Sequence, residues 1–352
     1  MKTKKNITIL FGGRSAEHEV SINSASAVYD HLDKKNFEPI CIYINKNGMW
    51  KVVESPKCSN EIREKGPFFP FLPWNARNRT ELPESSVYFP VLHGPYGEDG
   101  TIQGLLELAD VPYVGATVMS SAIGMDKAMA KYIFKSKGLP LARYDVLYED
   151  NWKQKRKKVM EEIKKKYRAP FFIKPSNLGS SIGITKVQSL SQLSEAIRLA
   201  FSYDRKILIE EAVEGREFEC SVLGNDNPVS SLPGEIIPSR NFYDYQDKYV
   251  EGKTGFGIPA DIPASKAKEI QRISIAAFQS IECSGMARVD FFLQQKSQKI
   301  YLNEINTIPG FTEISMYPKL WEESGVTFTQ LLEKLITLAV QKHASKKRKK
   351  EI

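Results

Sequence analysis

Short apolar segments alternate with longer amphipathic ones along most of the chain. The apolar segment Ile7 to Phe11 leads into the pair Gly12-Gly13, and apolar residues then recur on one helical face over 16–32. Another apolar segment follows at 37–44. A buried strand, a tight loop, a helix and a second strand are typical of a parallel α/β unit. We therefore expect a Rossmann-like parallel α/β domain over residues 1–121.

The alternation continues beyond residue 122 with closer spacing. The pattern predicts helices at 127–137, 152–167 and 190–201, and strands at 171–174, 183–187 and 206–210. A further region begins with a strand at 217–223 and closes with a helix at 328–343. The segment 55–86 is rich in proline and aromatic residues and predicts no element. We expect two more structural units, at 122–210 and 211–343.

Two strand-like segments near the C-terminal end carry the most information. Residues 286–293 and 299–306 each alternate apolar and polar positions, and the polar segment 294–298 lies between them. Two such segments joined by a short polar turn are typical of a β-hairpin.

The hairpin predicts a charged face. A turn centred near Ser297 places Asp290 opposite Glu304 and Arg288 opposite Asn306, with all four side chains on one side. Two opposed carboxylates repel each other unless a cation lies between them, and Asp, Glu and Asn oxygens are ligands that Mg²⁺ prefers. The alternative is a solvated face of mixed charge, and a register slip of one residue would remove the site.

Composition and charge narrow the classes of protein. The chain has 352 residues, 41% of them hydrophobic and 26% charged, which fits a globular protein of two or three domains. Half of the formal net charge of +8 lies in Lys346 to Glu351. We expect a disordered basic tail at 344–352, with no specific nucleic-acid partner. The basic run 153–168 is interpreted as a solvated helix face.

Cysteines and hydropathy point to the cytoplasm. The four cysteines are scattered without a CxxC pair, so we expect neither a zinc site nor a disulfide framework. The apolar stretch Ile7 to Phe11 is too short for a signal peptide, and no stretch is long enough to cross a membrane. We expect a cytoplasmic protein without a membrane partner.

Three further segments are candidates for ligand binding. Lys174 ends an apolar strand and precedes the small-residue loop 176–183, which is suited to cradle phosphate, although a plain hairpin loop is an equal alternative. The segment 207–217 passes from an apolar strand into an acidic turn. The segment 255–260 fits the dinucleotide pattern G-x-G-x-x-A, but no strand precedes it, and Pro259 and Pro263 argue against a following helix. We interpret it as part of a lid loop that begins near Asn241, against the alternative of a surface loop with buried tyrosines.

Taken in order, these segments resemble the D-alanine–D-alanine ligases of the ATP-grasp superfamily. The resemblance covers about residues 7–335. It is carried by the motifs Gly12 to Ser21, His93-Gly94 with Gly97 to Gly100, Lys174-Pro175 with Gly179 to Gly183, Tyr243 to Tyr249, Arg288 to Asp290, and Asn303 to Gly310. It implies an N-terminal α/β domain followed by a two-subdomain ATP-grasp fold, with ATP as co-substrate.

The resemblance also implies a set of site residues. ATP would be bound by Lys127, Lys174, Ser181, Glu210, Glu211, Ala212, Val213 and Glu217. Two Mg²⁺ ions, with Mn²⁺ as a substitute, would be held by Asp290, Glu304 and Asn306. The amino-acid substrates would be bound by His93, Lys248, Gly310, Ser315 and Met316. The catalytic residues would be Glu17, Ser180, Tyr249 and Arg288.

The implied activity is the ATP-dependent joining of two D-alanines through an acyl phosphate, for peptidoglycan precursors, by a homodimer. Tyr249 stands where relatives that use D-lactate have histidine, and Met316 stands beside Ser315 where relatives that use D-serine are expected to have arginine. Two alternatives remain open at this point. One is an ATP-grasp ligase that uses D-lactate or D-serine as its second substrate, and the other is a non-catalytic nucleotide-binding protein.

Overall fold

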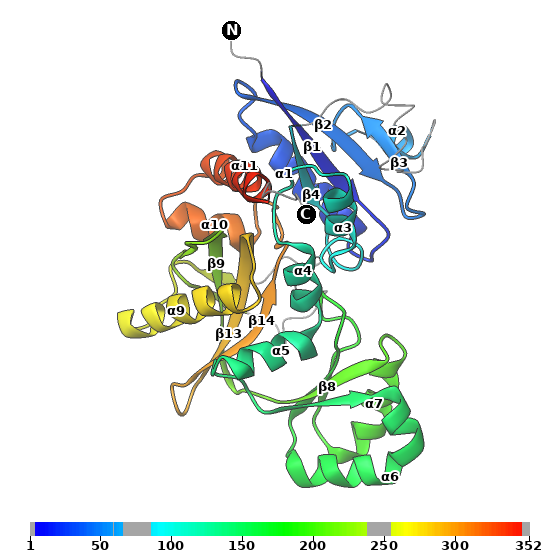
Figure 1. Ribbon diagram of the computed structural model, residues 1–352. Helices are drawn as coiled ribbons and strands as arrows, with labels where there is room; N and C mark the ends of the chain where they lie inside the picture. The colour runs from blue at the N-terminus through cyan, green and yellow to red at the C-terminus, as the bar shows by residue number, and fades with distance from the viewer. Residues whose placement is uncertain (1–3, 59, 66–85, 238–254, 347–352) are drawn as a thin grey trace, which may run out of the picture.

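Three β-sheets follow one another along the molecule (Figure 1). The computed structural model describes residues 4–58, 60–65, 86–237 and 255–346. The N-terminal sheet has the order β3-β2-β1-β4, in which β1 (Lys5–Gly12) pairs in parallel with β2 (Phe37–Ile44) and β4 (Val87–Val91). The predicted parallel α/β opening is confirmed. The edge strand β3 (Trp50–Val53), which was not predicted, is antiparallel to β2.

Helices cover both faces of the N-terminal sheet. Because side chains alternate across a strand, Ile9 and Phe11 pack toward α1 (His18–His31) and α11 (Phe328–Ser345), and Leu10 packs toward α3 (Thr101–Leu108). The last helix of the chain therefore closes the core of the first domain. The helix α2 (Asn60–Glu64) follows β3.

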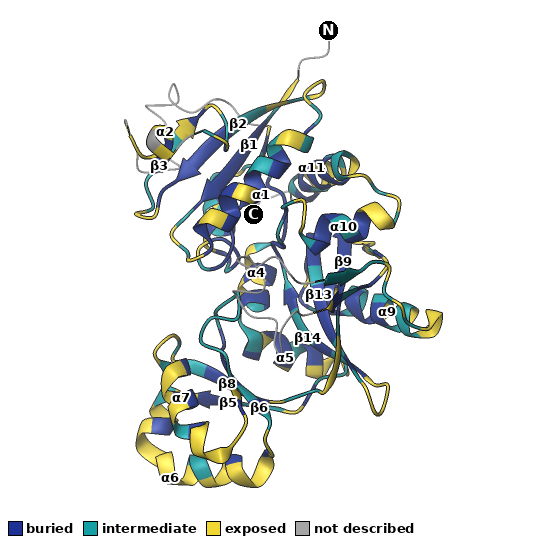
Figure 2. Cartoon of the chain, turned by 180° about the vertical axis from the view of Figure 1, so that it is seen from behind, coloured by how far each residue is buried: buried dark blue, intermediate teal, exposed yellow. Residues whose placement is uncertain are grey.

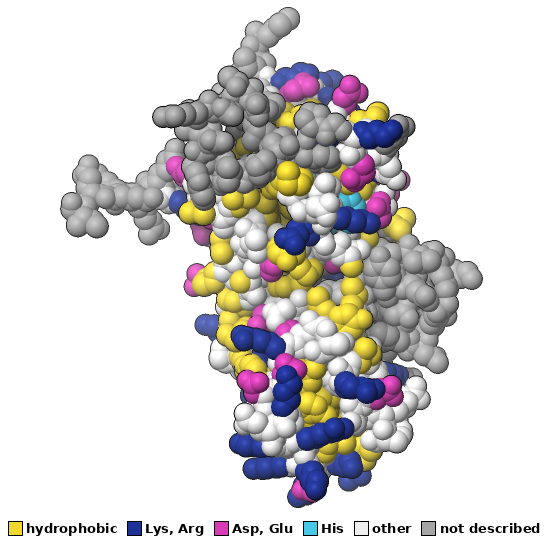
Figure 3. Space-filling model, turned by 90° about the vertical axis from the view of Figure 1, so that its right-hand side faces the viewer, with side chains coloured by type: hydrophobic (Ala, Val, Ile, Leu, Met, Phe, Trp, Pro, Cys, Tyr) yellow, Lys and Arg dark blue, Asp and Glu magenta, His cyan; other side chains and the backbone are white. Residues whose placement is uncertain are grey.

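The second sheet in chain order is antiparallel throughout, in the order β5-β8-β6-β7. Its strands are β5 (Tyr144–Tyr148), β6 (Phe171–Pro175), β7 (Thr185–Val187) and β8 (Lys206–Glu211). Its core is shared with α6 (Glu149–Lys166) and α7 (Leu193–Phe201), and α7 follows the 3₁₀ turn Leu190–Gln192. The basic run lies on the exposed side of α6, as predicted (Figures 2 and 3).

The third sheet carries the predicted hairpin, in the order β12-β11-β9-β13-β14. Its strands are β9 (Gly215–Gly224), β11 (Gly234–Ile237), β12 (Gly255–Gly257), β13 (Gly285–Gln294) and β14 (Ile300–Asn306), and β10 (Val229–Ser230) pairs with β9. The helix α9 (Ala264–Ser280) packs on this sheet. The helix α10 (Met316–Glu323) lies between this sheet and α11.

Two helices join the sheets. The helix α4 (Val118–Met125) contacts β14, and α5 (Lys127–Ser136) contacts both β8 and β14. The predicted boundary at residue 121 falls inside α4. The division into units at 121 and 210 therefore stays a prediction.

Three expectations need correction. Gly255–Gly257 is a strand that pairs with β11, not part of a loop. Pro263 does not prevent a helix, because it directly precedes the first residue of α9, where the missing N–H group of proline costs nothing. The helix α11 runs to Ser345, two residues into the predicted tail, and residues 347–352 lie outside the described part.

Candidate active site

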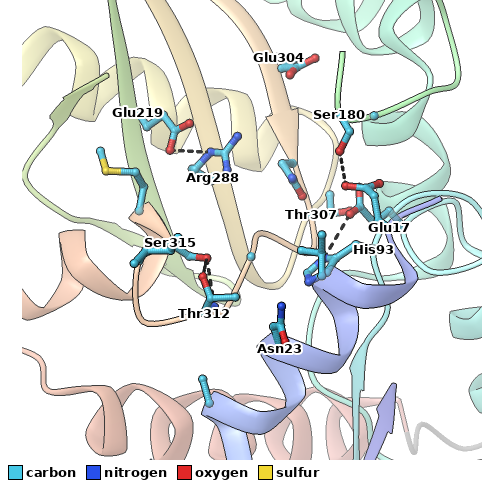
Figure 4. Close-up of a pocket in the computed structure, with 18 of the residues that line it drawn as sticks. Glu17, Asn23, His93, Ser180, Glu219, Arg288, Glu304, Thr307, Thr312 and Ser315 are labelled. Atoms are coloured by element: carbon cyan, nitrogen blue, oxygen red, sulfur yellow. Dashed lines mark hydrogen bonds and ion pairs between the residues drawn. The ribbon is translucent and has the colours of Figure 1, made fainter. Parts of the chain in front are cut away.

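A cavity of about 580 Å³ lies where the three sheets approach one another. Its walls come from the hairpin, the first turns of α1, the 176–183 loop and the segment 304–316. Figure 4 shows Glu304 and Arg288 on one side of this space, Glu17, Ser180 and His93 on another, and Thr312 and Ser315 below. Segments that are far apart in the sequence thus share one site.

The hairpin face is confirmed in its register. Asp290 pairs with Glu304 and Arg288 with Asn306, and a shift of one residue occurs only beyond Asp290, where Phe291 pairs with Leu302. A bulge placed there leaves the charged face intact.

The structure adds a carboxylate that the sequence analysis missed. Glu219 on β9 pairs directly with Asp290, so Glu219, Asp290 and Glu304 form a row across three strands. Nothing in the sequence indicates that β9 lies beside β13. The guanidinium of Arg288 binds both inner carboxylates, with Nε 3.0 Å from Glu219 Oε2 and 2.8 Å from Asp290 Oδ1, and Nη2 2.7 Å from Asp290 Oδ2.

The predicted metal ligands fit a hard cation by their chemistry. Asp290, Glu304 and Asn306 offer oxygen donors from neighbouring positions of one sheet face. Among the described residues there is no cluster of three or more His, Cys, Asp and Glu arranged to hold a metal ion. The predicted set depends on the amide of Asn306, and the carboxylate of Asp290 is bound to Arg288 in this structure.

The side chain of Lys127 connects the 176–183 loop to the hairpin. Lys127 Nζ lies 3.3 Å from Glu304 Oε2 and donates to the carbonyl of Leu178 at 2.7 Å. Because this lysine bridges the loop and the acidic face, it lies where an anionic phosphate would meet both. This position is compatible with the ATP-binding role that the resemblance implies for Lys127, which stays a prediction.

Lys174 belongs to a buried ionic cluster. Glu210 accepts from Lys174 Nζ at 2.6 Å and lies 2.5 Å from Lys131 Nζ, which also donates to the carbonyl of Asn303 at 3.0 Å. Burial alone would raise the pKa of Glu210, but the two lysines outweigh it and lower that pKa to about 2. Burial disfavours the charged form of a lysine and lowers the pKa of Lys131. Burial has the same effect on Lys174, but the charge of Glu210 outweighs it and keeps the pKa of Lys174 above its usual value.

The small-residue loop reaches the N-terminal domain through Ser180. Its hydroxyl donates to the carboxylate of Glu17, and the left-handed backbone of Ser180 and Ser181 turns the loop there. Glu17 lies just before α1 and is buried. The predicted pair of Glu17 and Ser180 is therefore brought together.

His93 is held on both ring nitrogens. Nε2 lies 2.9 Å from Ser24 Oγ, and Nδ1 lies 3.2 Å from the carbonyl of Ile308 and 3.6 Å from Glu98 Oε1. Burial lowers the pKa of His93, but the hydrogen bond and charge of Glu98, together with the charge of Glu17, outweigh burial and raise it. The sequence analysis did not identify Ser24 or Glu98 as neighbours of this histidine.

Ser315 and Gly310 both line the cavity. Ser315 precedes the first residue of α10, and its hydroxyl accepts from the backbone of Thr312 at 3.1 Å. A β-carbon on Gly310 would lie 2.7 Å from Ser315 Oγ, so a larger residue there would displace the Ser315 hydroxyl. Met316 also lines the cavity.

The remaining predicted residues either lie at the edge of the site or fall outside the described residues. Glu217 lies on β9 two positions before Glu219 and close enough to raise the pKa of Lys174. Ala212 and Val213 lie in the connection between β8 and β9, and Glu211 is exposed and paired with Arg143 at 3.4 Å. Lys248 and Tyr249 lie outside the described residues.

Family models match most of the chain. The model described as D-ala D-ala ligase N-terminus matches residues 6–116, and the model described as D-ala D-ala ligase C-terminus matches residues 133–337. The chain belongs to the D-alanine–D-alanine ligase family. The ATP-grasp fold expected from the sequence is the fold of this family, and ATP is its co-substrate.

Individual relatives agree with this assignment. The D-alanine–D-alanine ligase of Thermoanaerobacter sp. strain X514 is 48% identical over 358 residues, covering 97% of this chain and 98% of that one. The D-alanine–D-alanine ligase structure from Coxiella burnetii has a TM-score of 0.83 at 36% identity, over 97% of this chain and 95% of that one. The VanG D-Ala:D-Ser ligase of Enterococcus faecalis has a TM-score of 0.84 at 37% identity, over 96% and 100%.

Proposed function

We propose that the protein joins two D-alanines with ATP, through an acyl phosphate, to give D-alanyl-D-alanine for peptidoglycan precursors. The observation that carries the proposal is the position of Lys127, which bridges the phosphate-type loop at Leu178 and the acidic hairpin at Glu304. That contact brings the 176–183 loop and the carboxylate-rich hairpin face to one cavity, which Glu17 also lines. In the proposed reaction the loop would bind phosphate, the hairpin face would bind cations, and Glu17 would bind an ammonium group.

In the first step, a carboxylate oxygen of one D-alanine attacks the γ-phosphorus of ATP, and ADP leaves. Lys127 and Lys174 offset the charge of the phosphates, and Glu210 holds Lys174 protonated and in place. Glu17 binds the ammonium group of this D-alanine, and the contact of Ser180 with Glu17 closes the loop over it.

Asp290, Glu304 and Asn306 would hold the divalent cations. Bound Mg²⁺ supplies charge neutralisation for the transferred phosphoryl group and orients its oxygens. The protein's own part is the placement of these three oxygen donors on one face by the hairpin register.

In the second step, the amine of the other D-alanine attacks the acyl carbon, and inorganic phosphate leaves. The tetrahedral intermediate carries an oxyanion, for which Arg288 and the backbone N–H of Gly310 are the stabilising groups. The carboxylate of the second D-alanine would lie at Ser315, where the start of α10 favours negative charge, with Lys248 as its counter-charge.

The choice of second substrate is the most informative test. We expect D-alanine to be joined in preference to D-serine and D-lactate, because Met316 offers an apolar wall without a group to bind a hydroxyl. The reaction contains ATP, Mg²⁺ and isotopically labelled D-alanine as the first substrate. Equal amounts of D-alanine, D-serine and D-lactate compete as the second substrate, and the products are separated by mass. Predominance of D-alanyl-D-serine or D-alanyl-D-lactate would overturn this choice.

Family membership also supports two wider proposals, a homodimer and a cytoplasmic location. In the described ranges no helix combines the length and hydropathy needed to span a bilayer. Light scattering coupled to gel filtration gives the mass in solution, and twice the chain mass of 39.9 kDa is expected.

A further inference from the structure

Ser24 is a fully buried serine that contacts two parts of the candidate active site at once. It lies on α1, and its side-chain oxygen is 2.9 Å from His93 Nε2 and 3.2 Å from the backbone nitrogen of Phe311. His93 Nδ1 in turn lies 3.2 Å from the carbonyl of Ile308. Two side chains of the N-terminal domain therefore hold both ends of the turn 308–311, which contains Gly310.

The donors and acceptors of this ring of contacts are fixed by chemistry. The N–H of Phe311 can only donate, so Ser24 Oγ accepts from it, and the carbonyl of Ile308 can only accept, so His93 Nδ1 donates to it. Protonation of His93 changes only the bond between Ser24 Oγ and His93 Nε2. The Ser24 hydroxyl donates to Nε2 when the ring is neutral, and Ser24 Oγ accepts from Nε2 when the ring is charged. The hold on the turn is thus kept in either state.

The turn is also anchored on its other sides. The ring of Phe311 is fully buried, with its centroid 5.8 Å from that of Phe89 and 5.4 Å from that of Tyr317. Asn306 Oδ1 accepts from the backbone of Ile308 at 3.0 Å. The Ser24 hydroxyl thus fixes the peptide that joins Gly310 to Phe311, and His93 fixes the peptide that joins Ile308 to Pro309. The Pro309–Gly310 peptide, which carries the N–H of Gly310, is therefore held from both sides.

We propose that Ser24 is a positioning residue, which couples His93 to the turn 308–311 and so aims the N–H of Gly310 at the oxyanion of the tetrahedral intermediate. This inference rests on the proposed function, since it assigns Gly310 a part in the second step. It predicts a defect in the chemical step rather than in ATP binding.

The chain offers a matched control for this serine. Ser21 lies one turn earlier on α1, is equally buried, accepts from the backbone of Gly12 at 2.8 Å and donates to the carbonyl of Val91. Its hydroxyl also bridges two backbone segments, but neither lies in the turn 308–311. Loss of either hydroxyl should cost similar stability, and only one should change the chemistry.

The kinetic test compares Ser24→Ala with Ser21→Ala. Small displacements of catalytic groups cost large factors in rate, so we expect kcat of Ser24→Ala to fall about 10- to 100-fold. The KM for ATP should stay within about twofold of wild type, because binding shared by ground and transition states is untouched. Affinity for a phosphinate dipeptide analogue, a tetrahedral mimic, should fall in parallel with kcat. Ser21→Ala should keep wild-type kcat.

Two further measurements keep the proposal falsifiable. Ser24→Cys fills the same space with a weakly hydrogen-bonding sulfur, and its kcat should lie between those of wild type and Ser24→Ala. Hydrogen exchange of the Phe311 amide should accelerate in Ser24→Ala and not in Ser21→Ala, a result that needs no ligase activity. Wild-type kcat in Ser24→Ala, an equal loss in both alanine variants, or unchanged exchange at Phe311 would overturn the role of Ser24. Absence of ligation by the wild-type protein would instead overturn the proposed function.

Discussion

At the scale of single residues, Arg288 shows how the site is preorganised. Its guanidinium lies between Glu219 and Asp290, and both carboxylates are buried. A cation fixed by two partners needs little rearrangement when negative charge develops nearby, which is the condition for strong transition-state stabilisation. The ion pairs therefore serve orientation more than stability, since buried ion pairs add little net stability.

Replacement of Arg288 by alanine should affect the chemistry far more than nucleotide binding. We expect kcat to fall about 100- to 1000-fold, as for other oxyanion-stabilising groups, with a much smaller change in the KM for ATP. Steady-state kinetics with ATP varied at saturating D-alanine give both values. A variant that binds ATP weakly but keeps its kcat would contradict this role.

Glu210 should make a measurable part of the stability depend on pH. Its pKa falls from 4.5 to about 2 on folding, so its contribution is present above pH 4.5 and is lost as the pH falls toward 2. Glu210→Gln leaves Lys131 and Lys174 without their carboxylate and should destabilise the protein at neutral pH. Urea unfolding at pH 6 and pH 3 should show the difference from wild type narrowing at pH 3. A constant difference would contradict the ionic account.

A site residue could be predicted from the sequence when its partner lies close to it along the chain. Alternation within one hairpin is enough to place Asp290 opposite Glu304, because the two strands are neighbours in the sequence. Glu219, Ser24 and Lys131 were missed because their partners lie on elements at least 69 positions away. Their importance arises from tertiary packing, which local patterns do not report.

At the scale of elements, the 176–183 loop and the start of α1 act together. Ser180 donates to Glu17, and Lys127 holds the loop at Leu178. A loop that contacts both α5 and the residue before α1 can order the site only when both contacts are made.

We expect Glu17→Gln and Ser180→Ala to be non-additive. Each should raise the KM for D-alanine, and the double variant should lose less than the sum of the two, with a coupling of about 1 kcal/mol. A double-mutant cycle on kcat/KM gives this energy. Strict additivity would mean that the contact between the two side chains has no part in catalysis.

The elements missed by sequence analysis share physical causes. The strands β3, β5 and β12 are edge strands of three to five residues, too short to show a periodic pattern. The helix α9 was obscured by Pro263, which marks its start and not a break. Long periodic segments such as α1 and β13 were predicted within two residues at each end.

At the scale of the whole molecule, the order of the chain differs from the order of packing. The last helix, α11, packs on the first sheet, and Phe311 joins the same core. The predicted basic tail therefore begins beside the N-terminal domain, where Lys346 reaches Glu107 and His343 lies 3.1 Å from Asp110.

Removal of residues 347–352 should leave turnover unchanged, since Lys346 and the contacts of α11 remain. A deletion that begins at residue 343 should lower the thermal midpoint, because it removes the contacts with Glu107 and Asp110. Turnover and thermal unfolding of the two truncated proteins separate these effects. Loss of turnover on removal of 347–352 alone would favour a binding function for the tail.

The central claim is that a carboxylate of the first D-alanine is activated as an acyl phosphate. With D-alanine labelled by ¹⁸O at both carboxylate oxygens, the oxygen that attacks ATP leaves with the phosphate when the amine displaces it. Mass spectrometry of the products, formed with ATP and Mg²⁺, should find one ¹⁸O atom in each released phosphate and a dipeptide whose new amide keeps one ¹⁸O. Dipeptide formed with unlabelled phosphate, or no dipeptide at all, would contradict the account.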